Sequence, residues 1–221
     1  LIFSEQVDEQ PYFLIMMLPP TDTAAPVSQP RELVFVIDTS GSMHGTSLQQ
    51  AKKALHLALD GLKPDDRFNV VQFNSVTQSL FAGSVSASAA NVATASGYVD
   101  GLVANGGTEM RRALELALAD AASETHLRQV IFITDGSVGN ENELFEVIER
   151  KLGATRLFTV GIGSAPNGWF MRKAAEAGRG TYVFISALHE VNEKMGRLFR
   201  KLERPQVTDI KLEWPDGVAA S

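Results

Sequence analysis

The feature that most constrains the fold is an uninterrupted apolar run that ends in a carboxylate. Residues 33–37 read Leu-Val-Phe-Val-Ile, and Asp38 follows directly. A strand with one face in water alternates apolar and polar side chains, so this run favours a central parallel strand that is covered on both faces. The run therefore predicts an α/β protein with a polar site where this strand ends.

Strand and helix patterns alternate through the rest of the central region. Strands are predicted at Arg67–Phe73, Val76–Phe81, Gln129–Thr134, Arg156–Ile162 and Thr181–Ile185, and helices at 46–62, Ser88–Val103, Glu109–Ala122, Glu141–Leu152, Trp169–Ala177 and Glu190–Leu202. Thr46 or Ser47 is the expected cap of the first helix. The short connection Asn74-Ser75 makes the strands on either side of it antiparallel. We expect a doubly wound, mostly parallel sheet with one antiparallel edge strand and helices on both faces.

The two ends of the chain do not fit this alternation. Tyr12–Leu18 is typical of a strand, and the Pro-rich segment Pro19–Pro30 is typical of a linker. After Pro205, Val207–Trp214 alternates like a strand with one face in water. We expect residues 1–30 to hold a flanking strand and linker from a preceding domain, 31–204 the α/β domain, and 205–221 a second flanking strand, both strands lying outside the central sheet.

Composition excludes several classes of function. The net charge of −6 and a pI near 5.3 argue against nucleic acid as a partner. The absence of cysteine removes disulfides, thiolate zinc sites and thiol nucleophiles. Tyr12–Leu18 is far shorter than the ~20 residues of a membrane-spanning helix, so no membrane insertion is expected in this segment. The chain starts at Leu1 rather than methionine, so a targeting segment would not be visible.

Polar residues spaced two apart follow the Leu33 strand. A tight loop can point the side-chain oxygens of Asp38, Ser40 and Ser42 toward one place, which favours Mg²⁺ or a similar hard cation. Taken singly, each hydroxyl residue after a strand is more often a turn former or a helix cap. Gly106-Gly107-Thr108 and Thr134-Asp135-Gly136 supply further polar groups after other elements, and the joint occurrence favours a site.

These three segments together resemble the metal-ion-dependent adhesion site of von Willebrand factor type A domains. The family has the doubly wound fold already inferred. The resemblance implies that Ser40, Ser42 and Thr108 give hydroxyls to the metal, and that Asp38 and Asp135 act directly or through coordinated water. It implies Mg²⁺ or Mn²⁺, with Ca²⁺ less suited because Ca²⁺ prefers more oxygens. It also implies a protein ligand whose acidic residue completes the coordination.

The wider sequence is similar to the A domain of inter-alpha-trypsin inhibitor heavy chains and, more so, of bacterial sortase-target surface proteins. The residues that carry this similarity are Arg31–Met43, Phe73–Ser75 and Ala177–Tyr182. The similarity implies a secreted or cell-surface protein with a role in adhesion, and a neighbouring β domain in the same polypeptide that precedes the A domain.

Two other functions compete with adhesion. One is a structural A domain whose metal is idle. The other is a metal hydrolase in which His44 serves as base for a metal-bound water. An aspartyl-phosphate phosphatase is disfavoured because Ser40 stands where the second aspartate of that mechanism would be needed. We expect a binding module and not an enzyme.

Overall fold

The computed structural model describes residues 1–8, 10–16, 29–119, 125–136, 139–164 and 166–203, which fall into two separate units. The first unit holds strands β1 (Ile2–Val7) and β2 (Gln10–Ile15), paired antiparallel with Ile2 opposite Ile15. The second unit holds all the other described elements. In the parts of the chain that are described, no helix is both long and apolar enough to cross a bilayer.

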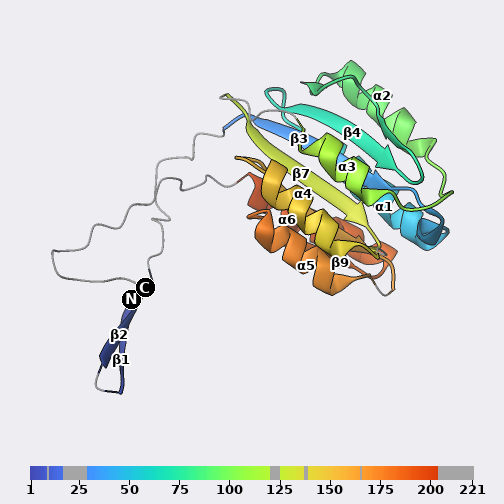
Figure 1. Cartoon of the computed structure of the whole chain (residues 1–221). Coiled ribbons are helices and arrows are strands. Elements are labelled where there is room, and N and C mark those ends of the chain that lie inside the picture. Colours follow the sequence, from blue (N-terminus) through green and yellow to red (C-terminus); the bar gives the residue numbers. More distant parts are fainter. Residues whose placement is uncertain (9, 17–28, 120–124, 137–138, 165, 204–221) are drawn as a thin grey trace. The chain divides into compact units, whose positions relative to one another are not determined.

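The second unit alternates strands and helices along the chain (Figure 1). In order they are β3 (Arg31–Asp38), η1 (Gly41–Met43), α1 (Thr46–Asp60), β4 (Arg67–Phe73), β5 (Thr77–Ser79), β6 (Val85–Ser86), α2 (Ala89–Asp100), α3 (Met110–Ala117), β7 (Leu127–Thr134), α4 (Glu141–Lys151), β8 (Arg156–Ile162), α5 (Gly168–Ala177), β9 (Tyr182–Ile185), η2 (Leu188–Glu190) and α6 (Val191–Leu202).

The sheet of this unit has the strand order β5-β4-β3-β7-β8-β9, with β6 paired to β4. Every pair from β4 through β9 in that order is parallel, whereas β5 and β6 run antiparallel to β4. The expected doubly wound fold is therefore confirmed. The first strand of the sheet is β3; β4 and β5 follow on one side of it, and β7, β8 and β9 on the other. The strand order therefore reverses between β3 and β7, and folds of this kind bind ligands at such a reversal.

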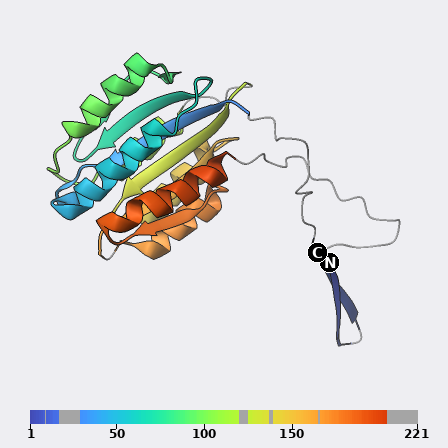
Figure 2. The same ribbon diagram turned by 180° about the vertical axis from the view of Figure 1, so that it is seen from behind.

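Helices cover both faces of the sheet (Figures 1 and 2). Helices α3, α4 and α5 lie on one face, and α1, α2 and α6 lie on the other. The apolar run of β3 serves both layers, because Leu33, Phe35 and Ile37 pack in the cluster with α1, α2 and α6, while Val34 and Val36 pack in the other. Each such burial stabilises the fold by about 1.5–3 kcal/mol before entropy is counted. The absence of polar alternation in β3 is explained by this double burial.

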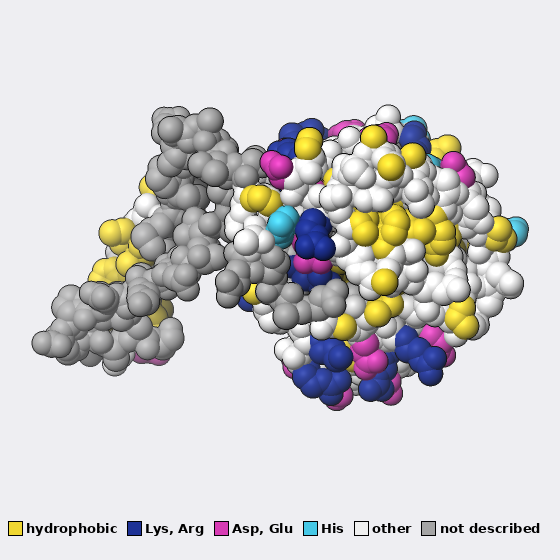
Figure 3. Space-filling view, turned by 90° about the horizontal axis from the view of Figure 1, so that it is seen from above, with side chains coloured by type: hydrophobic (Ala, Val, Ile, Leu, Met, Phe, Trp, Pro, Cys, Tyr) yellow, Lys and Arg dark blue, Asp and Glu magenta, His cyan; other side chains and the backbone are white. Residues whose placement is uncertain are grey.

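Apolar side chains near one edge of the sheet extend the core. Figure 3 views the molecule from the side on which α2 and β4 lie in Figure 1, and hydrophobic side chains gather in the middle of that face with charged ones around it. Leu80 and Phe81, which follow β5, and Val85 of β6 are partly buried against the core cluster of α1, α2 and α6. Strand β5 itself is Thr-Gln-Ser, and its Gln78 and Ser79 are exposed.

Several details differ from the sequence-based expectations. The strand expected at Tyr12–Leu18 is β2, and its partner β1 and the short strand β6 were not indicated by any pattern. Helix α3 ends at Ala117, before the expected Ala122, and residues 120–124 lie outside the described part. The predicted cap of α1 is wrong: Thr46 and Ser47 lie inside the helix, and the residue before it is Gly45, with φ of 78°. The strand expected at Val207–Trp214 lies outside the described residues.

Candidate metal centre

Three loops meet at the carboxyl ends of β3, β4 and β7. The loop after β3 is bonded to the loop before α3, since the amide of Gly41 donates to the carbonyl of Gly106 at 3.0 Å and the amide of Asn105 donates to that of Thr39 at 2.8 Å. The amide of Thr39 also donates to the carbonyl of Phe73, at the end of β4. These backbone bonds bring the loop after β3 to one edge of the sheet together with the loop before α3, which lies about 65 residues further along the chain.

Asp38 lies at the floor of this edge and is fully buried. Its Oδ1 accepts a hydrogen bond from the amide of Ser40 at 2.8 Å, and its Oδ2 accepts one from the hydroxyl of Thr134 at 2.5 Å. Burial raises the pKa of the Asp38 carboxyl, hydrogen bonds from Ser40 and Thr134 oppose that shift, and the nearby charge of Asp135 adds to it. A cation bound here would stabilise the ionised carboxylate that burial disfavours.

Two serine hydroxyls lie beside Asp38. The Oγ atoms of Ser40 and Ser42 are 3.0 Å apart, with Ser40 buried and Ser42 exposed. Neighbouring ligands of an octahedral Mg²⁺ lie about 2.9 Å apart, because each oxygen is 2.0–2.1 Å from the ion and the angle between them is a right angle. The two serine hydroxyls share a hydrogen bond in this structure, and their separation is also close to that of two adjacent ligands of a small hard cation.

Thr108 and Asp135 lie at the same edge. The loop of Thr108 is fixed on both sides, because Gly107 donates its amide to Ser75 Oγ and Glu109 donates its amide to the Asn74 carbonyl, both at 2.7 Å. Asp135 follows β7 and is half-buried.

The structure thus brings the predicted site residues to one place by different means. Hydrogen bonds join Asp38, Ser40 and Ser42 directly. Backbone bonds of its loop hold Thr108, and Asp135 is close enough for its charge to act on Asp38.

Sequence reasoning missed Thr134 as a positioning residue. Its hydroxyl donates to Asp38 and accepts from the amide of Gly136 at 2.9 Å, so it ties the end of β3 to the loop after β7. Asn74 is a second such residue, because its side-chain amide donates to the Thr39 hydroxyl at 3.3 Å. The available signal was that Thr134 ends a buried strand and Asn74 follows one, as Asp38 and Asp135 do at the ends of β3 and β7.

The donor set limits the chemistry of the site. Among the described residues no group of three or more His, Cys, Asp or Glu side chains could hold a metal, so a cation at this edge would depend on hydroxyls. Hydroxyl and carboxylate oxygens suit hard ions such as Mg²⁺ and Mn²⁺. With three neutral hydroxyls and at most two carboxylates, the bound ion would remain electrophilic.

Comparison with known proteins assigns the chain to a family. A family model described as the von Willebrand factor type A domain matches residues 31–184, the span that contains the sheet and all three loops. The chain belongs to this family. The type A domain is also 32% identical over 189 residues to a von Willebrand factor A domain-containing protein of Dictyostelium discoideum. That alignment covers 85% of this chain and 20% of the relative, so the chain spans about a fifth of that relative's length.

Solved structures agree on the fold of the type A domain. A von Willebrand factor type A protein from Catenulispora acidiphila superposes with a TM-score of 0.69 at 28% identity, covering 76% of this chain and 42% of that one. Manganese-loaded TRAP protein of Plasmodium vivax gives 0.58 at 22% identity, covering 74% and 71%. Proximal thread matrix protein 1 from the mussel byssus, with a zinc-occupied MIDAS motif, gives 0.59 at 18% identity, covering 79% and 46%.

Proposed function

We propose that this type A domain is a metal-dependent protein-binding module. In this proposal Ser40, Ser42 and Thr108 give hydroxyl ligands to a divalent cation, and Asp38 and Asp135 act directly or through coordinated water. The observation that carries the proposal is the pair of serine hydroxyls 3.0 Å apart beside a fully buried carboxylate. A buried carboxylate is costly without a positive partner, and a cation at the serine pair would supply one.

We infer that the metal is Mg²⁺ or Mn²⁺ rather than Ca²⁺. Five protein ligands at most leave room for water but fall short of the larger number of oxygens that Ca²⁺ prefers. The solved neighbours with manganese or zinc in their names support a divalent ion in this kind of domain. Tight zinc uptake with no binding of Mg²⁺ or Mn²⁺ would contradict the inference.

The proposed ligand is a protein that presents an acidic side chain. An electrophilic ion with an open position attracts a carboxylate strongly at short range. The chain itself carries a net charge of −6, so this attraction is local and is lost when the metal is removed. Adhesion on a secreted or cell-surface protein is the setting that fits, as the resemblance to inter-alpha-trypsin inhibitor heavy chains and sortase-target proteins implies.

A second proposed partner is a neighbouring β domain of the same polypeptide. Strands β1 and β2 form a two-stranded sheet in which every described residue is exposed, including Phe3, Phe13 and Leu14. A two-stranded hairpin is marginally stable in water, and further strands or a covering layer would stabilise it by burying its exposed apolar side chains. The aligned region is 20% of the matching relative, so a protein of that length has room for such a domain.

The competing functions have less support. In the hydrolase alternative His44 would be the base, but its side chain is exposed, and no contact of this structure aims it at the serine pair or at Asp38. If the metal is idle and only structural, acidic partners should bind no better with the ion than without it. Partner binding measured with Mg²⁺ and with EDTA separates that outcome from metal-dependent binding.

The test uses the whole chain and Mn²⁺, which can be followed by electron paramagnetic resonance. Binding should be weakened at least about 10-fold by Ser42→Ala, because one of the few ligands is removed. The matched control is Ser79→Ala, an exposed serine of β5, which should bind Mn²⁺ like the parent. A pull-down from extracellular material with Mg²⁺ and with EDTA then tests ligand binding. Equal capture under both conditions would favour the idle metal.

A further inference from the structure

A cavity lies next to the candidate metal centre and is not used by it. It has a volume of about 290 Å³ and is lined mainly by the start of α1 and by the segment that follows α2. Leu48 and Leu102 form an apolar floor and are 9% and 5% exposed, whereas Val103 stands at the mouth and is 70% exposed. The volume is close to the lower end of the range for small-ligand pockets, so the cavity is large enough to receive an aliphatic side chain.

The cavity and the metal centre share two chain segments. His44, which lines the cavity, follows Ser42 by two residues, so their Cα atoms are at most about 8 Å apart. On the other side Ala104 lines the cavity, and the next residue, Asn105, is bonded to the carbonyl of Thr39. Side chains of an extended peptide alternate between its two faces and each residue advances ~3.3 Å, so the residue two positions from the one at the metal points to the same side and lies about 6.6 Å along the chain, comparable to the Ser42–His44 separation.

The mouth of the cavity is open and carries no negative charge. Gly45 forms part of the lining, has a φ of 78°, and a Cβ built on it would meet nothing within 4 Å. His44 and Lys52 also line the cavity, and none of its lining residues is an aspartate or glutamate. In a chain of net charge −6, this is a place that an acidic peptide can approach without local repulsion.

We propose that this cavity is a subsite for an apolar side chain two positions away from the acidic residue of the protein ligand. The proposal rests on the proposed function, because the carboxylate at the metal sets the register of the peptide. The partner is therefore an extended protein segment that carries a leucine or a residue of similar size two positions from an acidic residue. Metal binding selects the acid, and the Leu48–Val103 cavity selects the apolar side chain.

Three blocked pentapeptides test the subsite by nuclear magnetic resonance on the whole chain, each titrated with Mg²⁺ and with EDTA. They are acetyl-Leu-Ala-Asp-Ala-Leu-amide, whose leucines flank the aspartate at a distance of two positions, the serine-flanked acetyl-Ser-Ala-Asp-Ala-Ser-amide, and acetyl-Leu-Ala-Asn-Ala-Leu-amide. The asparagine peptide lacks the carboxylate and should show no Mg²⁺-dependent binding. The leucine-flanked aspartate should bind about tenfold more tightly than the serine-flanked one, the factor expected when part of a leucine side chain leaves water. The methyl groups of Leu48, Leu102 and Val103 should shift with that peptide and not with the serine-flanked one.

Variants localise the effect. Val103→Ser removes apolar surface at the mouth and should lower the leucine-to-serine affinity ratio to about threefold. The matched control is Leu188→Ser, an exposed leucine that does not line the cavity and should keep the parent ratio.

Each outcome decides the matter. Equal, Mg²⁺-dependent affinity for the two aspartate peptides would overturn the subsite and leave the proposed function standing. Binding of the leucine-flanked aspartate that is the same in EDTA would overturn the coupling to the metal, and with it this inference. If neither aspartate peptide binds in the presence of Mg²⁺, both the subsite and the proposed function are wrong.

Discussion

Asp38 carries the largest unfavourable burial of charge in the candidate site. Its carboxylate is fully buried, and both of its oxygens already accept hydrogen bonds, from the Ser40 amide and from the Thr134 hydroxyl. These bonds orient the carboxylate but supply no positive charge. The metal-free protein therefore carries the cost of a buried negative group, and a bound cation would remove that cost.

Asp38→Asn should accordingly have opposite effects on stability and on metal binding. The amide keeps the shape and can still accept from the Ser40 amide, so the metal-free variant should gain on the order of 1 kcal/mol in free energy of unfolding. Its affinity for Mn²⁺ should be lost, because the negative group is gone. Urea denaturation with EDTA measures the first effect and a Mn²⁺ titration the second. A variant that unfolds would show that Asp38 has a structural role.

The stability difference between that variant and the parent should depend on pH. Burial raises the pKa of Asp38 above its ordinary value of 3.8, so between these two values the folded protein binds more protons than the unfolded chain. The parent is then destabilised as pH rises through the interval. The advantage of Asp38→Asn should be complete above the raised pKa, shrink as pH falls through it, and vanish below 3.8. Denaturation midpoints of both proteins, measured across this pH range, test the prediction. A stability difference that does not change with pH would contradict it.

Gly106 holds the loop before Thr108 in a conformation that other residues avoid. Its φ is 77°, and a Cβ would lie 2.8 Å from Ser75 Oγ, whose hydroxyl accepts from the amide of Gly107. Gly106→Ala should cost about 1–2 kcal/mol from backbone strain and should also weaken Mn²⁺ binding by displacing the loop. The control is Gly97→Ala in the exposed part of α2, where a Cβ meets nothing and helix propensity predicts a gain of roughly 1 kcal/mol.

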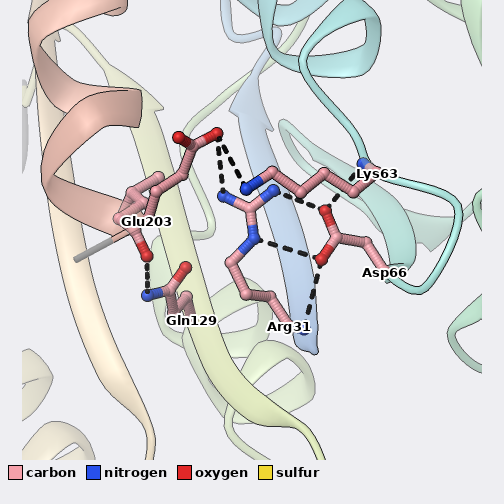
Figure 4. A network of polar contacts seen from close by, with 6 residues as sticks. Arg31, Lys63, Asp66, Gln129 and Glu203 are labelled. Carbon is pink, nitrogen blue, oxygen red and sulfur yellow. Dashed lines mark hydrogen bonds and ion pairs between the residues drawn. The ribbon is translucent and has the colours of Figure 1, made fainter. Parts of the chain in front are cut away.

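At the scale of elements, a buried ion pair joins the beginning of β3 to the turn before β4 (Figure 4). The Arg31 guanidinium contacts both carboxylate oxygens of Asp66, and Asp66 also accepts the backbone amides of Arg31 and Lys63. Glu203, at the end of α6, lies 4.0 Å from Arg31 Nη1 and 3.6 Å from the Lys63 ammonium. Arg31 and Asp66 are almost fully buried, so loss of either partner would leave the charge of the other buried without compensation.

Removing one charge of the pair should be more damaging than removing both. Arg31→Met leaves the Asp66 carboxylate buried without its cation and should cost about 3–5 kcal/mol. The double variant Arg31→Met, Asp66→Asn should recover part of that loss, because the buried charge is gone and the asparagine oxygen can still accept a backbone hydrogen bond. Glu203→Gln is the matched surface change and should cost less than about 1 kcal/mol, because Glu203 is 38% exposed. Guanidinium denaturation of the four proteins gives the comparison. Equal losses for the single and double variants would contradict the argument.

At the scale of the whole molecule, the two units differ in how they are stabilised. All residues of both core clusters lie between Leu33 and Leu202, so the α/β unit has a core of its own. Strands β1 and β2 contribute no buried side chain. Deleting residues 1–28 should therefore change the free energy of unfolding of the remainder by less than about 0.5 kcal/mol. A loss of several kcal/mol on urea denaturation would show that the first unit supports the second.

By itself, the sequence determined the order and type of the elements and the fold class. It could do so because these depend on short-range patterns: the apolar run of β3, the helical spacing of α1, and the Asn74-Ser75 turn that makes β5 antiparallel to β4. It also singled out Asp38, Ser40 and Ser42, because these residues, spaced two apart directly after the strand, carry both the carboxylate and the hydroxyls. The strands β1 and β6 could not be read this way, since their residues show no distinctive pattern.

Only the tertiary structure decided how the site is held together. Thr134 meets Asp38 because β3 and β7 are neighbours in the sheet, although 96 positions separate the two residues in sequence. The same holds for the bond from Gly41 to Gly106 and for the cavity between the start of α1 and the segment after α2. Contacts of this kind depend on which strands become neighbours and how the helices pack on them, and no local spacing records that choice.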